Sequence, residues 1–587
     1  MKTKLVLLAV AAALLPVLSS CVSPGSFDGD EITRYQQAML SKGPQPRSYG
    51  RLGAFQPAPG TTGPVLRVET DQAGQSYVYL SLDEAVQRAL ANSIDIQVLS
   101  YEPAIAREQA TQAAAAFDVI LFGSFQHQKQ VAPSLFRFRN PVYENTLQTG
   151  LQQTTITGGT WQLAGSWTRY HNNGYGDGYQ RYHQNSLTLQ VQQPLLRNAW
   201  PAVTLAQLRI AQLNYRNTTV QFRQRVEAVV NSVVGGYWML LQARASVEVQ
   251  EDLLRATEET RDRIWQRIEI DATLVELKQA EAAVEIRRAS LFRARKNVLD
   301  VQDQLARLLA DAQINALSPC EIIPTTLPSK LLVEIDPADQ LALALIYNPQ
   351  LEQARLAISA SQIQVRVARN QTLPNLTLQA GATTAGINRE VSGAADNLFS
   401  LENMGYNVSL LFEYPIGNRQ AEALWRQRQY ETNRAVTQLQ NLSDSLAVSI
   451  RERLRQIETS HLEMQATRLA VDASAAQLEA INTTERVRGR LTPEFLQLKL
   501  NAQESLANAR LTELSAMVNY NQALADLAMV TGTILQQYGI AMEKMPNVTQ
   551  HRAWTVTQGD APTRAIDLTA PGGGQPPTEL EPANRFR

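Results

Sequence analysis

The stretch SLTLQVQQPLL, from Ser186 to Leu196, decides the predicted fold. Successive side chains of a β-strand point to opposite faces, so Leu187, Leu189 and Val191 share one face of the predicted strand. The opposite face carries the polar side chains of Ser186, Thr188, Gln190 and Gln192. A half-buried strand of a soluble β-sandwich shows the same alternation, so this stretch alone leaves its surroundings open.

The composition of the whole chain excludes some classes of protein. The 587 residues carry a formal net charge of −1, which gives no indication of a nucleic-acid partner. After the leader, the sequence contains no run of about 18 apolar residues, the length that a transmembrane helix needs. The sequence therefore predicts a protein that is compatible with water along most of its length.

The N-terminus resembles a bacterial lipoprotein signal. Lys2 and Lys4 precede an apolar run, and the segment LSSC ends at Cys21. We expect residues 1–20 to be a signal peptide and Cys21 to carry acyl chains such as palmitate, each buried methylene adding about 0.8 kcal/mol of membrane affinity. The alternative is a plain secretory peptide with a chance cysteine. Val22 stands where an aspartate favours inner-membrane retention, so we expect the outer membrane.

The chain contains an internal repeat. The segment LDEAVQRALANS, from Leu82, aligns without a gap with ADQLALALIYNP, from Ala338. Each copy begins with a helix start, a capping box at Ser81–Glu84 in the first and a cap followed by a first-turn proline at Asp336–Pro337 in the second. We therefore expect the two halves to share one plan.

Each opening helix is followed by candidate strands and then by a long helical segment. The strands end at Pro194 in the first half and at Pro415 in the second. Apolar residues then recur with heptad spacing, as in Val226, Val230, Val233, Tyr237 and Leu240. The pair Gly235-Gly236 lies inside this seam and indicates a close helix contact, the alternative being a hinge. Folded in two, each segment gives arms of about 50 residues, or about 75 Å at 1.5 Å per residue.

This order of segments resembles the outer membrane efflux protein family, also called TolC-like. The resemblance covers residues 79–537 and rests on LDEAVQRALANS, on the two strand-proline segments, and on the closing segment NAQESLANARLTELSAMVNYNQALADLAMVTGTIL. It implies an α+β, mainly α fold and a homotrimer, with one shared transmembrane β-barrel and a periplasmic α-helical tunnel. The apolar face of SLTLQVQQPLL would then meet lipid, and its polar face would line a water-filled channel.

The resemblance also implies a function. The trimer would be the passive exit duct of a tripartite efflux or type I secretion system, with a periplasmic adaptor and an inner-membrane pump as partners. The duct would lie in the outer membrane of a Gram-negative-type bacterium, with its helices in the periplasm. The alternative is a non-channel periplasmic coiled-coil lipoprotein that acts as an envelope scaffold. The matched alternating strands in both halves argue against a scaffold, which needs no barrel.

The expected domain organisation follows from these segments. We expect a signal peptide at 1–20, a lipidated tether at 21–78, a first repeat at 79–311 (strands at about 119–194, hairpin at about 199–311), a linker at 312–335, a second repeat at 336–537 (strands at about 375–415, hairpin at about 419–532) and a C-terminal segment with a disordered tail at 538–587.

The number of barrel strands is the point at which the sequence departs from the family plan. The resemblance implies about 4 strands per chain and about 12 in the trimer, which we take as the expectation. An additional hairpin candidate, LQQTTITGGTWQLAGSW, lies at 151–167 and is centred on a Gly-Gly pair. Two of the first-half segments would therefore merge, lie outside the membrane, or enlarge the barrel.

The sequence carries no recognisable catalytic or cofactor motif. The five histidines, His127, His171, His183, His461 and His551, lack the spacing of metal ligands. Neither a Walker loop nor a nucleophile elbow is present. We therefore expect no enzymatic activity, no metal and no cofactor.

The turn of the second helical hairpin, RVRGRLTPEFLQ from Arg486, is the candidate site. Its resemblance to the family's periplasmic tip implies that Gly489, Leu491 and Thr492 face the adaptor. Glu494 would form an acidic ring at the channel constriction, with Gln497 at a position where a second acid is usual. A plain helix-helix connection without a partner is the alternative. The first-half turn, RIEIDATLVE from Arg267, lacks the glycine.

Overall fold

The computed structural model describes most of the chain from residue 67 onward. The described residues are 67–70, 76–131, 141–172, 181–269, 272–311, 314, 320–400, 403–488, 492–544 and 554–558. The chain divides into a unit of residues 1–59 and a unit of residues 60–587. The first unit, with the expected signal peptide and Cys21, lies outside the described residues, so every element below belongs to the second unit.

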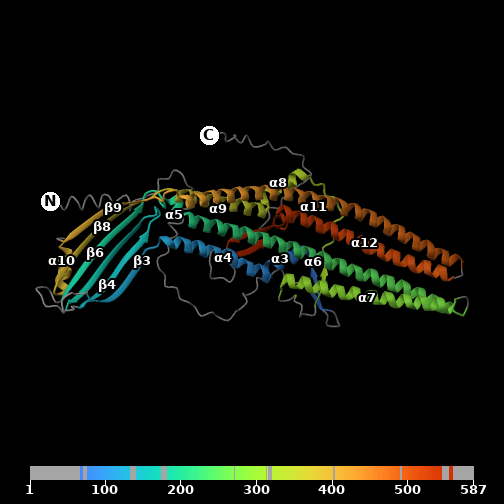
Figure 1. Ribbon diagram of the computed structural model, residues 1–587. Helices are drawn as coiled ribbons and strands as arrows, with labels where there is room; N and C mark the ends of the chain where they lie inside the picture. The colour runs from blue at the N-terminus through green and yellow to red at the C-terminus, as the bar shows by residue number, and fades with distance from the viewer. Residues whose placement is uncertain are drawn as a thin grey trace, which may run out of the picture. The chain divides into compact units, whose positions relative to one another are not determined.

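Six antiparallel strands form the main sheet, in the order β3-β4-β5-β6-β8-β9. These strands are β3 (Ile120–Val131), β4 (Pro141–Thr154), β5 (Thr160–Asn172), β6 (Arg181–Pro194), β8 (Asn375–Asn388) and β9 (Met404–Glu413). The expectation of four strands per chain is therefore wrong for this sheet, because the Gly-Gly-centred hairpin pairs on both sides as β4 and β5. Figure 1 shows the six strands side by side.

Long helices extend away from one end of this sheet (Figure 1). Four of them form two hairpins: α6 (Ala206–Arg267) with α7 (Leu274–Leu309), and α11 (Arg419–Arg488) with α12 (Pro493–Thr531). The other helices are α3 (Leu82–Asn92), α4 (Ile94–Ala114), α5 (Pro201–Thr204), α8 (Pro337–Tyr347), α9 (Pro349–Gln371), α10 (Val391–Phe399) and α13 (Ile534–Gln537), with a 3-10 turn at Ala115–Phe117. The predicted mainly helical α+β fold is confirmed. None of the described helices is both long and apolar enough to cross a membrane.

The predicted helix starts are confirmed in both halves. The Ser81 side chain accepts from the Glu84 backbone, and the Glu84 carboxylate accepts from the Ser81 backbone, which completes the capping box. Asp336 caps α8 with Pro337 in its first turn. Because unpaired N–H groups at a helix start are costly, these caps fix where each half begins.

A second, smaller sheet packs against the middle of α6. It consists of β1 (Arg67–Thr70), β2 (Ser76–Leu80) and β7 (Cys320–Pro324). A separate two-stranded sheet is formed by β10 (Ile540–Lys544) and β11 (Trp554–Gln558). Tyr237 of α6 is fully buried, donates to the Leu80 carbonyl at 3.1 Å and accepts from the Thr326 backbone at 2.7 Å. This hydroxyl therefore joins α6 both to the end of β2 and to the segment that follows β7.

The close helix contact expected at Gly235-Gly236 is also present. A Cβ added to Gly235 would lie 3.1 Å from the Gln522 side chain, and one added to Gly236 would lie 3.5 Å from Leu305. The two glycines therefore allow α7 and α12 to approach α6 closely along its heptad face.

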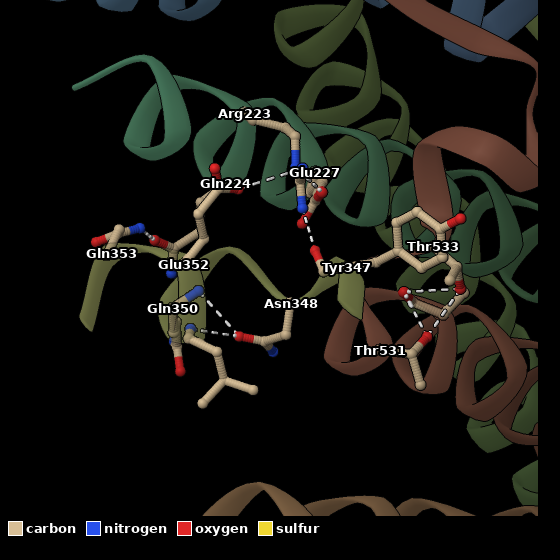
Figure 2. A network of polar contacts seen from close by, with 12 residues as sticks. Arg223, Gln224, Glu227, Tyr347, Asn348, Gln350, Glu352, Gln353, Thr531 and Thr533 are labelled. Atoms are coloured by element: carbon tan, nitrogen blue, oxygen red, sulfur yellow. Dashed lines mark hydrogen bonds and ion pairs between the residues drawn. The ribbon is translucent and has the colours of Figure 1, made fainter. Parts of the chain in front are cut away.

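A polar junction joins the two halves of the chain in the N-terminal half of α6 (Figure 2). The Asn348 side chain accepts from the Gln350 backbone at 2.9 Å and donates to the Val530 carbonyl at the end of α12, also at 2.9 Å. Arg223 of α6 donates to the Tyr347 carbonyl and, at 3.1 Å, to the Glu227 carboxylate. The turn between α8 and α9 is thereby held against both α6 and α12.

Glu227 is the most unusual residue of this junction. Its side chain is only 3% exposed. Burial raises the pKa of Glu227 to about 7, although the charge of Arg223 and its hydrogen bond pull the pKa down. An ionised carboxylate at this position is therefore opposed by desolvation at neutral pH.

The raised pKa predicts a pH-dependent stability. Between pH 4.5 and about 7 the folded chain keeps the Glu227 proton that the unfolded chain releases, so the free energy of unfolding falls as pH rises through this range. We expect the free energy of unfolding of the wild type to fall by roughly 2–3 kcal/mol between pH 5 and pH 8, and this loss to be absent in Glu227→Gln. Denaturant unfolding in detergent at the two pH values measures it. Glu463→Gln, at an exposed site on α11, is the control and should behave as wild type; equal pH dependence in all three proteins would contradict the assignment.

Candidate channel wall and helical tips

Apolar side chains gather on one face of the main sheet, which we call the apolar face. In an antiparallel sheet, residues paired across strands lie on the same face. One paired row crosses the whole sheet through Leu121, Leu151, Leu163, Leu189, Ala382 and Tyr406. Neighbouring rows add Phe125, Leu147, Trp161, Trp167, Val191, Val408 and Leu410. The apolar side predicted for β6 therefore continues over all six strands.

The opposite face, called here the polar face, carries amides and hydroxyls. Its glutamines are Gln126, Gln128, Gln130, Gln148, Gln152, Gln162, Gln184, Gln190, Gln192 and Gln379. Hydroxyl pairs link neighbouring strands at Thr146 and Thr168 (3.1 Å), Ser166 and Ser186 (2.7 Å), and Thr188 and Thr383 (3.2 Å). Among the described strand residues on this face, only Glu144 and Glu413 are acidic or basic. This face is suited to contact water without a strong charge.

Aromatic and basic side chains border the apolar face at the end far from the helices. The Tyr143 ring stacks on His127 (6.5 Å between centroids) and on His171 (6.2 Å), with the Lys129 ammonium 5.5 Å from it. Trp167 stacks on His183 at 5.6 Å. Rings with a polar edge are typical of the boundary between an apolar band and water. Within the described part of the chain, His, Cys, Asp and Glu side chains do not gather into a group that could hold a metal ion.

The turn between β4 and β5 is fixed to the chain that enters α6. Gly158 has a φ of +86°, and an added Cβ would lie 2.2 Å from the Asn198 carbonyl, so only glycine fits there. The Thr157 hydroxyl donates to the Gln193 side chain at 2.9 Å, and the Thr157 carbonyl accepts from the Trp200 backbone at 3.1 Å. The hairpin is thus joined to the sheet at its turn as well as along its strands.

The tip of the second helical hairpin contains the sequence-predicted site residues. Thr492 is exposed and caps α12, its hydroxyl accepting from the Phe495 backbone at 3.3 Å. Glu494 is exposed in the first turn of α12. Gly489 and Leu491 lie outside the described residues.

Gln497 joins the two helical hairpins at their tips. It is exposed, its side-chain oxygen accepts from Gln279 of α7, and its amide donates to Asn501 at 2.8 Å. The first-half tip begins α7 with a capping box between Thr273 and Glu276. The structure therefore brings the two tips together, which the sequence did not predict.

Buried charges below the tips were also missed by the sequence analysis. The Lys499 ammonium lies 2.6 Å from the Glu485 carboxylate, and both side chains are largely buried. Arg287 of α7 is buried and donates to the Thr257 hydroxyl, to Gln503 at 3.0 Å and to the Leu500 carbonyl at 2.8 Å. A charged residue on a heptad helix gives no sequence signal that distinguishes such a contact from an exposed side chain.

Comparisons with known proteins agree with this geometry. No model of a known protein family matches the chain. The chain is 25% identical over 370 residues to the outer membrane protein TolC of Escherichia coli (strain K12), a match that spans 61% of this chain and 73% of TolC. It is 24% identical over 372 residues to TolC of Salmonella enteritidis, spanning 61% of this chain and 72% of the relative.

Solved structures show the same fold. The structure of CusC has a TM-score of 0.57 at 15% identity, covering 77% of this chain and 92% of CusC. The Campylobacter jejuni CmeC outer membrane channel has a TM-score of 0.56 at 15% identity, covering 77% of this chain and 86% of CmeC. The prediction that the chain is not an enzyme agrees with these similarities, because TolC-like channels transport and do not catalyse. In its fold and over most of its sequence, the chain is therefore similar to TolC and to other outer-membrane channel proteins of bacteria.

Proposed function

We propose that three copies of this chain assemble into a passive exit duct, which receives substrates from an inner-membrane pump through a periplasmic adaptor. The observation that carries the proposal is the main sheet, with one apolar face, one polar face and two edge strands, β3 and β9. A sheet that is apolar on one side and hydrated on the other fits a barrel wall between lipid and water. Lipid offers no hydrogen-bond partner for backbone N–H and C=O groups. The edge strands of such a sheet therefore have to pair with those of neighbouring copies in a closed barrel.

The helical part of the proposal concerns the tips. Contact with the adaptor would involve Gly489, Leu491 and Thr492, and the exposed position of Thr492 at the start of α12 supports this for the described residue. The channel would open by an iris-like separation of the tips, biased by the adaptor. Since the chain is a channel, the energy for transport comes from the pump.

The envelope-scaffold alternative fits the structure less well. A scaffold would use the long helices but would gain nothing from a sheet that exposes leucines and phenylalanines. Phe125, Leu410 and Phe412 are 67%, 61% and 63% exposed on the single chain. Apolar patches of this extent mark a membrane or protein contact.

The test of the duct uses the mature protein in detergent. Single-particle electron microscopy should show a threefold tube with a detergent belt at the sheet end, and planar bilayers should show stepwise conductance. The physical reason is that the sheet buries its apolar face only in lipid or detergent. A thin rod, or a monomer without a belt and without conductance, would leave the scaffold as the better description.

The carboxylate of Glu494 leads us to expect that the tips favour cations over anions. Three copies around a threefold axis would form an acidic ring that favours cations. We expect Glu494→Gln to lower the cation-to-anion permeability ratio several-fold in planar bilayers under a salt gradient. Gln497→Glu, one helical turn away, adds a second acid and should raise the ratio. Unchanged selectivity in both variants would exclude a constriction at these residues.

A lipid anchor at Cys21 is the last part of the proposal, and it rests on the leader sequence alone. Metabolic labelling with palmitate should mark the wild-type protein, because a thioether-linked, acylated cysteine incorporates the fatty acid. Cys21→Ser should lose the label, whereas Cys320→Ser, at a buried residue of β7, should keep it. Label that survives in Cys21→Ser would show that acylation occurs elsewhere.

A further inference from the structure

Four of the six strands of the main sheet continue into helices. Helix α4 precedes β3, β6 precedes α6, α9 precedes β8, and β9 precedes α11. These four helices pack side by side in the order α4, α6, α9, α11, which is the order of their strands in the sheet. Strands β4 and β5 have no helix of their own, so this hairpin is an insertion between β3 and β6.

The inserted hairpin is a full member of the sheet. Strand β4 pairs with β3 along the whole of β3, and β5 pairs with β6 along nearly the whole of β5. On the polar face, the Ser166 and Ser186 hydroxyls join β5 to β6 at 2.7 Å. On the apolar face, the row from Leu121 to Leu189 passes through Leu151 and Leu163 without a change of character. Both faces of the hairpin therefore match those of the neighbouring strands.

The width of the sheet matches the width of the helical row. Four helices at about 9 Å spacing span about 36 Å. Six strands at about 4.8 Å spacing, tilted by about 40° as barrel strands are, span about 38 Å along the circumference. Four strands would span about 25 Å, so a barrel without the hairpin would be narrower than the row of helices.

The two edge strands are suited to pair with each other across copies. Within the described part of the chain, β3 and β9 are each paired on one side only. Strand β3 has 12 residues and runs away from the helices, whereas β9 has 10 residues and runs toward them. Copies placed side by side therefore bring these edges together antiparallel and nearly equal in length, as a closed barrel needs.

We propose that the inserted hairpin β4–β5 enlarges the barrel: three sheets of six strands, joined by β3 of one copy and β9 of the next, form a barrel of about 18 strands. This inference rests on the proposed trimeric duct. Because barrel diameter grows roughly linearly with strand number, the barrel is about 1.5-fold wider than one of about 12 strands. The polar face that would line it carries amides and hydroxyls, and only Glu144 and Glu413 are acidic or basic among the described strand residues of that face, so the wall selects solutes by size more than by charge.

The class of solute follows from this wall. A wide lumen lined by neutral hydrogen-bonding groups suits bulky hydrated solutes of either charge, such as an extended polymer chain. Discrimination by charge is then left to narrower parts of the duct.

The deciding experiment counts strands in the full-length protein in lipid nanodiscs by single-particle electron microscopy. A threefold barrel of about 18 strands is expected. A threefold barrel of about 12 strands, with β4–β5 outside the wall, would overturn this inference and leave the duct intact. A particle without a threefold tube would overturn both.

A deletion variant tests the role of the hairpin itself. Removing residues 141–180 joins β3 to β6 in the same up-and-down order, and we expect a narrower barrel that admits only smaller polyethylene glycols from the external side. Deleting 175–178, between β5 and β6, is the matched control and should keep the wild-type width and polymer limit. Equal limits in the two variants would contradict the inference, and if the larger deletion does not fold, the wild-type strand count still decides.

Discussion

Backbone hydrogen bonding in lipid is the constraint on which the rest of this structure depends. A strand that faces hydrocarbon needs partners on both sides, because each unpaired backbone group there costs several kcal/mol. Within the described part of one chain, five strand pairings provide the backbone hydrogen bonds inside the sheet. The outer edges of β3 and β9 are left without a partner strand. In the proposed duct, the single chain is therefore an arc of the barrel wall, and its apolar and polar faces would have their functions only in the closed assembly.

The helices meet a different constraint. Their backbone hydrogen bonds lie within each helix, so the helices are joined to one another through side chains. Heptad residues such as Val226, Val230 and Val233 are fully buried along α6. Polar contacts add to this apolar packing, and one of them is the buried Arg88–Asp311 ion pair at 2.6 Å between α3 and the segment that follows α7. A buried ion pair adds little net stability but makes misaligned packing costly, because a shift in register would leave a charge unpaired. Helices of 62 and 70 residues need such fixed points, since a uniform heptad face can slide.

Sequence alone predicted what local pattern controls. The alternation in β6, the Ser81–Glu84 capping box and the close contact at Gly235-Gly236 all depend on neighbouring residues, and the structure contains each of them. The number of strands was wrong because it depends on which segments pair. The polar junction was missed because its partners, such as Arg223 and Tyr347, are 124 positions apart and none of them is unusual in its own helix.

The polar contacts along the helices also limit where the duct can open. At the tips, Gln279 and Gln497 meet at an exposed site, and such a contact exchanges easily with water. Deeper in the bundle, Arg287 is buried and joins α7 to α6 and α12. Separating these helices there would leave its guanidinium without its three hydrogen-bond partners, which is costly for a buried charge. The Lys499–Glu485 pair lies next to this level and is also largely buried. In the proposed duct, an iris-like opening would therefore begin above Arg287 and break the exposed contacts first, while the bundle below would keep the register that supports the barrel.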